Sequence, residues 1–385
     1  MRRLLFLASA MIFFDVAFFA AIAPLLPEYV EELGLSEAQA GVLSAAYAAG
    51  TLLASLPAGF VASRIGPRRT VIYGLLLLGV SSLAFGLVEE INLLDAARFT
   101  QGIAGALIWA GALTWLITAS PDEARGSVIG TALGTAVAGA LLGPALGAVA
   151  ASIGTGLVFG SVLIVTTGLA IAASRLPETG APERQPLREV GATILSRPVL
   201  DAAAFVAVPS LMFGAIEVLV PLRIDALGGG HGVIAGGFIA GAGLEALLAP
   251  VAGRFSDRVG RRSPYVAGLS ICAMAMVGIA LAGTLGAVLA ALVLTSLGAG
   301  LCFAPALTLL SDVADSTNLH QGFAAGLSNM AWASGQVAGG VGGGVVATVT
   351  GNTAPCLAIA ALLLLTVAYA FRSLGPAVAS QPAEG

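Results

Sequence analysis

Twelve long apolar stretches are the feature of this sequence that most constrains its fold. Each is long enough to cross a bilayer as a helix, which takes about 20 residues, so twelve crossings would use about 240 positions. The chain has 385 residues, and the remainder suffices for loops, tails and helix ends. The stretches run near 4–27, 38–62, 70–88, 93–119, 127–151, 155–174, 199–222, 232–255, 264–284, 286–311, 322–349 and 353–371.

Composition supports a membrane location and excludes several other classes. Only 10% of the residues are charged, whereas soluble domains contain about 25%. The net charge of -4 leaves no basic face for a nucleic acid. A disulfide scaffold is also excluded, because all three cysteines fall inside apolar stretches, at Cys272, Cys302 and Cys356.

The basic residues predict the orientation, because cytoplasmic loops carry an excess of positive charge. All 17 are arginines. With the N-terminus inside, fifteen fall in cytoplasmic segments, Arg223 lies in an outer loop and Arg98 lies inside a span. We therefore expect both termini to be cytoplasmic in a multi-pass protein of the inner, cytoplasmic membrane. The first stretch could be interpreted as a signal peptide, but its length, its central Asp15 and the eleven stretches that follow favour a span.

The second half of the chain repeats the first at a shift of 194 residues. Gly59, Arg64, Gly66 and Arg68 align with Gly253, Arg258, Gly260 and Arg262. The repeat predicts an N-terminal six-helix half at 1–174, a cytoplasmic linker at 175–198, a C-terminal six-helix half at 199–372 and a cytoplasmic tail at 373–385. Parallel repeats of this kind place a substrate site between the halves, with alternating access.

Four arginines and one aspartate crowd the loop after the eighth stretch, in the order Gly253-Arg-Phe-Ser-Asp257-Arg258-Val-Gly260-Arg261-Arg262. An aspartate near a helix N-terminus is stabilised by the exposed amides and the helix dipole. Ion pairs that break and re-form there would make a conformational latch. The arginines alone, without Asp257, would also keep this loop on the cytoplasmic side. A latch and a plain topogenic loop therefore both stay open as interpretations.

This loop resembles the signature of the major facilitator superfamily, which is Gly, three residues, Asp-Arg, one residue, Gly-Arg-Arg. The family carries it after the second helix and again after the eighth. The second copy fits at every position, whereas the first has Ser63 in place of the aspartate, among Gly59, Arg64, Gly66, Arg68 and Arg69. Ser63 can still cap a helix N-terminus. The resemblance implies an all-α integral membrane protein with twelve transmembrane helices in two pseudo-symmetric six-helix halves.

Two further segments are similar to motifs of this family. Arg98-Phe-Thr-Gln101-Gly102-Ile-Ala-Gly105-Ala106 looks like its fourth-helix motif, in which the arginine is linked to proton transfer. Asp95 lies three residues earlier, so an ion pair within the helix is an alternative role for Arg98. The segment with Gly139, Gly143, Pro144 and Gly147 is similar to the fifth-helix motif of the exporters, with Ala148 where a second glycine is usual. Its glycines also suit close helix packing alone.

Three carboxylates remain inside predicted spans, at Asp15, Glu217 and Glu245. Each costs about 2.5 to 3.5 kcal/mol at mid-bilayer, and such a cost implies a use. Buried carboxylates can carry protons, and ionised ones attract cations. The seventh stretch carries Ile216-Glu217-Val-Leu-Val-Pro221, and the first, with Asp15, ends in Pro24-Leu-Leu-Pro27. Both resemble the drug:proton antiporter branch, which includes the vesicular monoamine transporters. This resemblance implies substrate contact at Asp15 and Glu217, whereas no motif supports Glu245.

Asn329, Trp332 and Gln336 share one helical face in the eleventh stretch. They line a cavity or form hydrogen bonds between helices, because polar groups facing lipid are costly. A second set of side chains lies near Asp15 in the sequence, at Met11, Phe14, Phe18 and Phe19. These side chains either form a largely aromatic wall for a substrate or pack in the ordinary way against other helices.

These features predict a secondary active transporter, a proton-coupled exporter of amphipathic or cationic organic molecules. Its expected partners are a small-molecule substrate, protons and membrane lipid, and we expect a monomer. The proton gradient supplies the energy, so no cofactor and no metal are expected. One alternative is a carrier for a neutral metabolite or sugar. A remote alternative is an integral membrane enzyme, but the chain has two histidines and lacks metal, phosphate-loop and nucleophile-elbow motifs.

Overall fold

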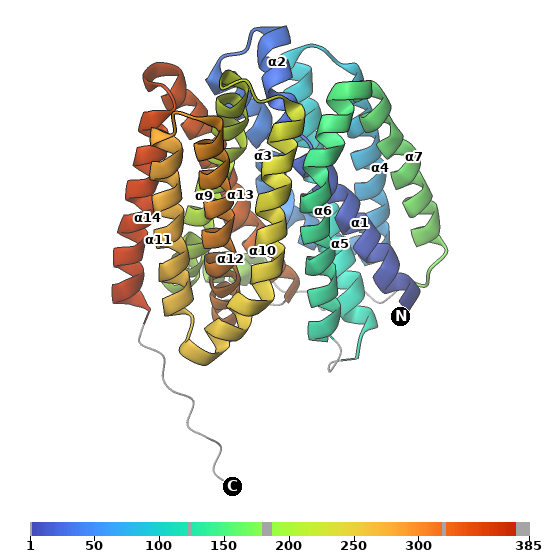
Figure 1. Cartoon of the computed structure of the whole chain (residues 1–385). Helices are drawn as coiled ribbons and strands as arrows, with labels where there is room; N and C mark the ends of the chain where they lie inside the picture. Colours follow the sequence, from blue (N-terminus) through green and yellow to red (C-terminus); the bar gives the residue numbers. More distant parts are fainter. Residues whose placement is uncertain (1, 122–124, 179–186, 318–320, 375–385) are drawn as a thin grey trace.

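The computed structural model describes residues 2–121, 125–178, 187–317 and 321–374, which form a bundle of long helices (Figure 1). These ranges contain no strand. A 3-10 turn, η1 (Ala23–Leu25), separates the first two helices. The helices are α1 (Arg2–Ala20), α2 (Leu26–Leu33), α3 (Glu37–Ile65), α4 (Pro67–Leu87), α5 (Ile91–Ala119), α6 (Arg125–Ile153), α7 (Thr155–Ser174), α8 (Leu187–Ile194), α9 (Arg197–Ala226), α10 (His231–Val259), α11 (Arg262–Leu281), α12 (Leu285–Ser316), α13 (Gln321–Thr350) and α14 (Thr353–Ser373).

Within the described residues, 11 helical segments are long and apolar enough to cross a membrane. They correspond to eleven of the twelve predicted stretches. The remaining stretch, near 322–349, forms α13, whose 30 residues also exceed the length of a span. Its many glycines, together with Asn329 and Gln336, make it less apolar than its neighbours. The predicted all-α membrane fold is therefore confirmed.

Hydropathy suggested one continuous helix over 4–27, but the first stretch is broken. α1 ends at Ala20, and the chain continues through η1 and α2 to Leu33. Pro24 and Pro27 are the second residues of η1 and α2, within the first turn of each. Proline fits there because those positions have no intrahelical partner for an N–H group. The break leaves the last carbonyl groups of α1 free for other donors.

Glycine allows a sharp reversal at the same place in both halves, which we define as α1–α7 and α9–α14. Gly66, between α3 and α4, has φ of 91°, and Gly260, between α10 and α11, has φ of 80°. Residues with a side chain rarely adopt such values. These are the repeated glycines of the loop signature. The signature therefore sets the backbone turn between consecutive spans in both halves.

Helix contacts also recur in the two halves. The pairs α1–α6, α3–α5, α4–α5 and α4–α7 reappear as α9–α13, α10–α12, α11–α12 and α11–α14. Glycines make the first of these contacts close. A Cβ atom added at Gly147 of α6 would lie 2.1 Å from the carbonyl oxygen of Ala21, and one at Gly339 of α13 would lie 1.8 Å from that of Leu211.

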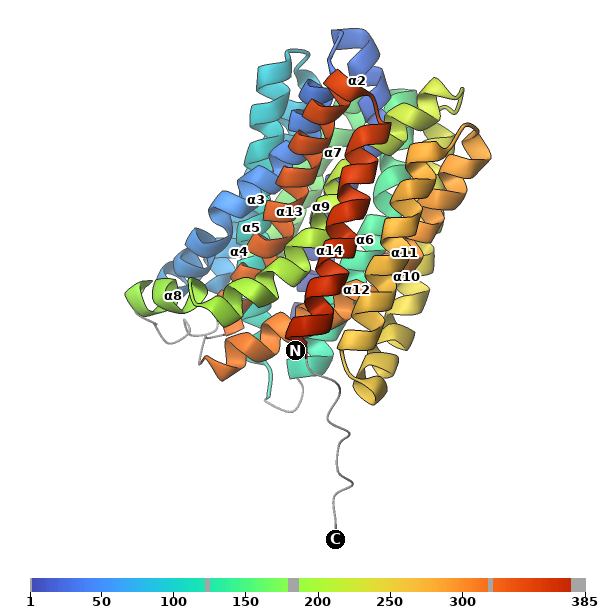
Figure 2. The ribbon, with the colours of Figure 1, turned by 90° about the vertical axis from the view of Figure 1, so that its left-hand side faces the viewer.

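The two halves meet along two helix pairs, α3 with α13 and α6 with α10; Figure 2 shows α3 beside α13. α1 begins and α14 finishes at one end of the bundle, which we call the terminal end, opposite the far end (Figure 1). At the far end, Ala38 N–H donates to Thr348 Oγ1 at 3.0 Å. His231 Nδ1 lies 2.6 Å from the carbonyl oxygen of Pro24. Direct hydrogen bonds thus join the halves at the far end.

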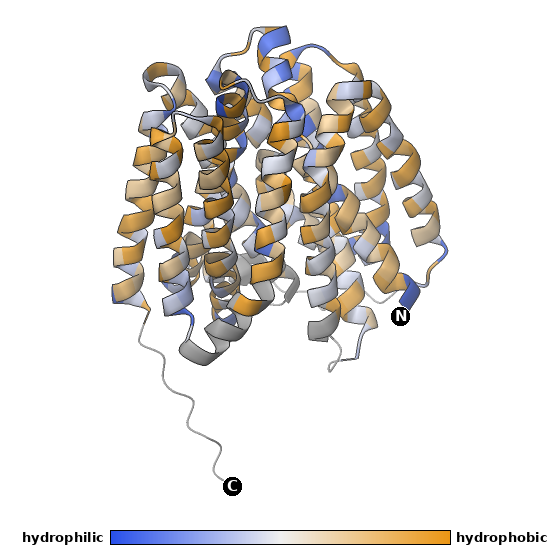
Figure 3. Ribbon diagram, in the orientation of Figure 1, coloured by the Kyte–Doolittle hydropathy of each residue, from blue (hydrophilic) through white to orange (hydrophobic). Residues whose placement is uncertain are grey.

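Polar and apolar residues are distributed as a bilayer requires. Apolar residues cover much of the outward helix surface, and hydrophilic residues gather at the two ends and inside the bundle (Figure 3). Exposed apolar side chains include Phe6, Ile164 and Leu365, each more than two thirds exposed. Such a surface is stable against lipid and would be unusual in water.

Candidate functional site: a charged cluster between the halves

Asp15 lies where α1, α3 and α5 meet, and its side chain is completely buried. Tyr47 of α3 donates its hydroxyl to Oδ1 at 2.9 Å. Trp109 of α5 donates its indole N–H to Oδ2 at 3.1 Å. Each carboxyl oxygen therefore accepts one hydrogen bond from an uncharged donor. This arrangement offsets part of the cost of burying the group.

Two glycines of α5 make room for this contact. A Cβ atom at Gly105 would lie 2.2 Å from Tyr47 Oη and 2.9 Å from Asp15 Oδ1. At Gly102 it would lie 1.8 Å from the carbonyl oxygen of Tyr47. The glycines of the predicted fourth-helix motif thus allow α3 to approach α5 and seat the tyrosine against the aspartate.

Arg98 is buried beside Asp15 and points toward the end of α1. Its guanidinium group donates to the carbonyl oxygens of Phe18 and Phe19, at 3.3 Å and 3.2 Å, and to Gln101 Oε1 at 3.0 Å. The two carbonyl groups belong to the last turn of α1 and lack intrahelical partners, so they attract a cation.

The ion pair between Arg98 and Asp95, the alternative role considered for this arginine, does not form. Asp95 Oδ1 is buried and has no hydrogen-bond partner within the described chain. The guanidinium group instead donates to the free carbonyl groups of α1. Because the break in α1 was not foreseen, these competing acceptors could not be recognised from the sequence.

Side chains of the second half reach this cluster from α9 and α13. Glu217 of α9 is partly buried, and the Gln336 side chain of α13 lies beside it. A Cβ atom at Gly214 would lie 2.2 Å from the carbonyl oxygen of Gln336, so this glycine lets the two helices touch. Across the halves, the rings of Phe19 and Trp332 pack edge to face with centroids 5.4 Å apart.

We call Asp15, Arg98 and Glu217 the central charged cluster. Arg98 attracts both carboxylates electrostatically. One arginine can neutralise only one carboxylate, so the ionised cluster carries one excess negative charge. Five predicted site residues from four helices therefore lie together, namely Asp15, Arg98, Glu217, Trp332 and Gln336.

Two predicted site residues lie outside this cluster. Glu245 of α10 is partly buried and packs against α12, where a Cβ atom at Gly300 would lie 3.6 Å from its Cγ. Asn329 is also partly buried and lies two turns from Gln336 toward the terminal end of α13. Their roles stay predictions.

Two residues of the site were missed by sequence reasoning, Tyr47 and Trp109. Each stands in the middle of an apolar stretch, where its ring is easily taken for packing. The available signal was chemical: a tyrosine O–H or tryptophan N–H inside a bilayer needs an acceptor, and few side chains there can serve.

The first copy of the loop signature forms an ion pair with the linker. Arg68 contacts Glu178 at 3.1 Å and donates to the carbonyl oxygen of Leu176 at 2.9 Å. Ser63, which replaces the aspartate, does not cap a helix. Its hydroxyl donates to the carbonyl oxygen of Phe60 at 2.8 Å, within its own helix, because Gly66 stands at the N-cap position of α4.

The second copy is described in part. The side chains of Gly253 to Val259 lie outside the described residues, so the predicted latch at Asp257 and Arg258 is not tested. Arg261 forms an ion pair with Asp312 of α12. The guanidinium carbon of Arg262 lies 4.5 Å from the ring centroid of Phe371 in α14. These contacts connect the loop between α10 and α11 to α12 and α14 of the second half.

The glycine motif of α6 packs within the first half. Cβ atoms at Gly139 and Gly143 would lie 2.6 Å from the carbonyl oxygens of Phe13 and Ala17 of α1. The motif, with Pro144 inside α6, therefore supports α1 near Asp15 rather than forming the contact between halves. A different face of the same segment makes that contact, where a Cβ atom at Gly243 of α10 would lie 3.6 Å from Leu141 Cδ1.

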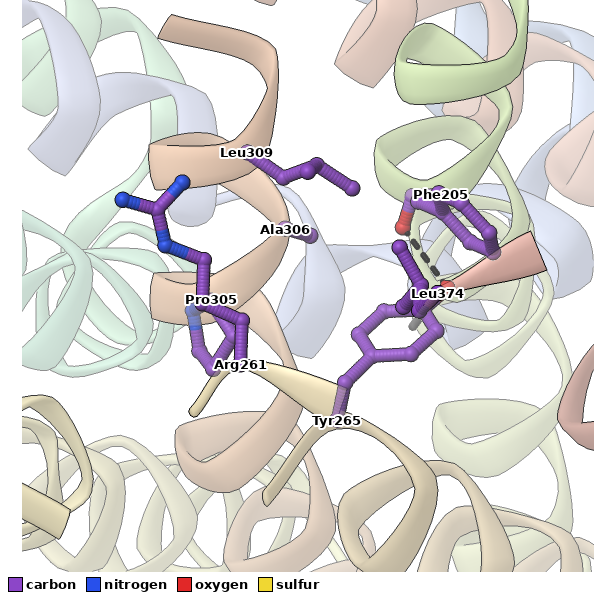
Figure 4. A pocket seen from close by; sticks show the side chains of 7 residues that line it. All are labelled: Phe205, Arg261, Tyr265, Pro305, Ala306, Leu309 and Leu374. Atoms are coloured by element: carbon purple, nitrogen blue, oxygen red, sulfur yellow. Dashed lines mark hydrogen bonds between the residues drawn. The ribbon is translucent and has the colours of Figure 1, made fainter. Parts of the chain in front are cut away.

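A separate small pocket lies at the terminal end of the second half (Figure 4). Its lining is mainly apolar, and Tyr265 donates its hydroxyl to the carbonyl oxygen of Phe205 at 2.9 Å. The lining residues are Phe205, Arg261, Tyr265, Pro305, Ala306, Leu309 and Leu374. The pocket contains no residue of the central charged cluster. Among the described residues, no group of three or more His, Cys, Asp or Glu side chains is placed to hold a metal ion.

The sequence is similar to bacterial drug-resistance proteins. Multidrug resistance protein 1 of Bacillus subtilis (strain 168) is 25% identical over 336 residues, which cover 84% of this chain and 85% of that protein. Quinolone resistance protein NorA of Staphylococcus aureus (strain MRSA252) is 25% identical over 130 residues. This second match spans only 34% of the length of NorA.

The fold is similar to those of solved transporters. A bacterial homologue of the human lysosomal transporter Spinster, in an inward-facing and unoccupied conformation, superposes with a TM-score of 0.75, at 13% identity over 96% of each chain. A D-xylose-proton symporter superposes with a TM-score of 0.75, at 15% identity over 97% of each chain. The Major Facilitator Superfamily model matches residues 5–340 and 232–385. The chain is therefore a membrane transporter rather than an enzyme, and it belongs to the major facilitator superfamily.

Proposed function

We propose that this protein exports amphipathic or cationic organic molecules in exchange for protons, by alternating access. The observation that carries the proposal is the central charged cluster, in which a completely buried carboxylate of one half faces a carboxylate of the other across a single arginine. The named functions of the relatives, multidrug and quinolone resistance, support an exporter of organic molecules.

The excess negative charge of the cluster explains how exchange would work. A proton on Asp15 balances the charge, and so does a cationic substrate beside Glu217. Holding both would leave an excess positive charge at low dielectric, which is unfavourable. Proton and cation therefore compete, and each drives out the other.

The position of the cluster suits access from alternate sides. It includes residues of α1 and α5 in one half and of α9 in the other, so movement between the halves would change its exposure. The arginine distribution supports placing the terminal end in the cytoplasm. The far-end hydrogen bonds Ala38–Thr348 and His231–Pro24 would then close the outer side. We further propose a monomer in a bacterial cytoplasmic membrane, without a cofactor.

Purified protein in liposomes would test the exchange. The probes are ethidium and tetraphenylphosphonium as cations, with chloramphenicol and xylose as uncharged compounds. With the lumen acidified, an antiporter takes the cations into the liposomes as protons leave, whereas a symporter needs acid outside. Asp15→Asn should abolish the accumulation driven by the pH gradient. Glu217→Gln should weaken cation binding about tenfold, which corresponds to about 1.4 kcal/mol of lost charge attraction.

Asp225→Asn is the matched control, because Asp225 is an exposed carboxylate on the same helix as Glu217. It should leave transport unchanged. Movement of xylose alone, coupled to protons, would favour the neutral-substrate alternative, which the fold of the D-xylose-proton symporter also accommodates. A double Asp15→Asn, Glu217→Gln protein that still concentrates a cation would contradict the assignment and shift attention to Glu245.

A further inference from the structure

The two donors that hold Asp15 differ in one chemical property. The indole N–H of Trp109 can donate a hydrogen bond but cannot accept one. The hydroxyl of Tyr47 can do either, because it can rotate and has lone pairs. The two carboxyl oxygens of Asp15 are therefore not equivalent: Oδ2 faces Trp109, and Oδ1 faces Tyr47.

We propose that Tyr47 is the group through which Asp15 gains and loses its proton, and that the proton resides on Oδ1. This inference rests on the proposed proton-coupled function. Asp15 Oδ2 lies 3.1 Å from Trp109 Nε1. A proton on Oδ2 would point at the indole N–H, so two donors would face each other and the hydrogen bond from Trp109 would be lost. A proton on Oδ1 lets Tyr47 turn from donor to acceptor, while Trp109 continues to donate to Oδ2.

Burial leaves Asp15 dependent on its neighbours for this transfer. Its side chain is completely buried, and Tyr47 and Trp109 are its hydrogen-bonding partners among the described side chains. The transfer is balanced without a tyrosinate. Tyr47 passes its hydroxyl proton to Oδ1 and takes one from a hydrated proton, which becomes water. Release runs in reverse, with the Oδ1 proton returning to Tyr47 as Tyr47 gives its own to water.

The surroundings hold the Tyr47 ring in place for this role. Phe19 packs against it with centroids 4.8 Å apart, and the guanidinium carbon of Arg98 lies 5.4 Å from its centroid. In the described chain, the charged groups that act on the site are Arg98 of α5 and, through Arg98, Glu217 of α9. Arg98 attracts both carboxylates, so Glu217 competes with Asp15 for the same positive charge.

The test follows the carboxylic C=O band of Asp15 by infrared spectroscopy after a pH jump, with the full-length protein in lipid. Asp15→Asn identifies the band by its loss. In Tyr47→Phe the band should respond at least ten times more slowly than in the parent protein. In Trp109→Phe the band should shift in frequency, because Asp15 Oδ2 loses the hydrogen bond from the indole N–H. Tyr265→Phe is the matched control, since it removes a buried hydroxyl that donates to a backbone carbonyl group in the other half.

A second measurement locates the proton. The protein has three tryptophans, so the 15N-labelled indole signal of Trp109 can be assigned by its absence in Trp109→Phe. It should stay hydrogen-bonded at both high and low pH. Loss of this hydrogen bond at low pH, or a parental rate in Tyr47→Phe, would overturn the inference while leaving the proposed function intact. A parental Asp15 band that does not respond to pH would overturn the proton role of Asp15 itself.

Discussion

Replacing Gly105 by alanine should destabilise this transporter and disconnect Tyr47 from Asp15. The added Cβ would lie 2.2 Å from Tyr47 Oη and 2.9 Å from Asp15 Oδ1. Tyr47 cannot retreat along α3, because its carbonyl oxygen already lies against Gly102 and its ring against Phe19. The hydroxyl must therefore leave the carboxylate.

The expected cost follows from three contributions. Losing a hydrogen bond to a charged group costs about 1.5 to 3 kcal/mol, and overpacking costs about 1 to 3 kcal/mol. The better helix propensity of alanine recovers about 1 kcal/mol. Gly105→Ala should therefore lower the free energy of unfolding by about 1.5 to 5 kcal/mol.

Reversible unfolding in mixed detergent micelles measures this change. Gly168→Ala is the matched control, because Gly168 also lies inside a helix and an added Cβ there meets nothing within 4 Å. It should be neutral or stabilising by up to about 1 kcal/mol. If Gly105→Ala proves as stable as Gly168→Ala, the close contact between Tyr47 and Asp15 does not exist as described.

Two further predictions concern topology and the loop signature. Single cysteines introduced at Ser36 and Asn352 should react with a membrane-impermeant thiol reagent added outside, and one at Gln185 only after the inside is exposed, because the arginine distribution predicts a cytoplasmic terminal end. Outside labelling at Gln185 would contradict this orientation. Asp257→Asn should slow transport while leaving the amount of membrane-inserted protein largely unchanged, with a smaller effect for a substitution at Ser63, and transport at the parental rate would refute the latch.

Much of the fold could be predicted because the bilayer restricts the choice so strongly. Apolar length alone identified the long helices, since a lipid-exposed backbone must satisfy its hydrogen bonds within each segment. The repeated glycines of the loop signature marked the turns at Gly66 and Gly260, because a positive φ strongly favours glycine. Family membership followed from the same loops and was confirmed by the match over nearly the whole chain.

The candidate site was only partly predictable. Asp15, Arg98 and Glu217 stood out because charges are costly inside a membrane. Their partners did not stand out, because a hydrogen bond between helices depends on which faces meet. Spacing along one helix offered Asp95 as an alternative partner for Arg98, yet its acceptors include carbonyl groups that become free where α1 ends.

The sequence by itself therefore determined the spans, the repeat and the buried charges, because hydropathy, duplication and cost of insertion are local properties of the chain. Only the tertiary structure decided that Tyr47 and Trp109 hold Asp15 and that Gln336 meets Glu217. These contacts join residues far apart in the chain through helix faces that glycines bring together. Which faces can approach so closely depends on the packing of several helices at once, and no single stretch of sequence contains that information.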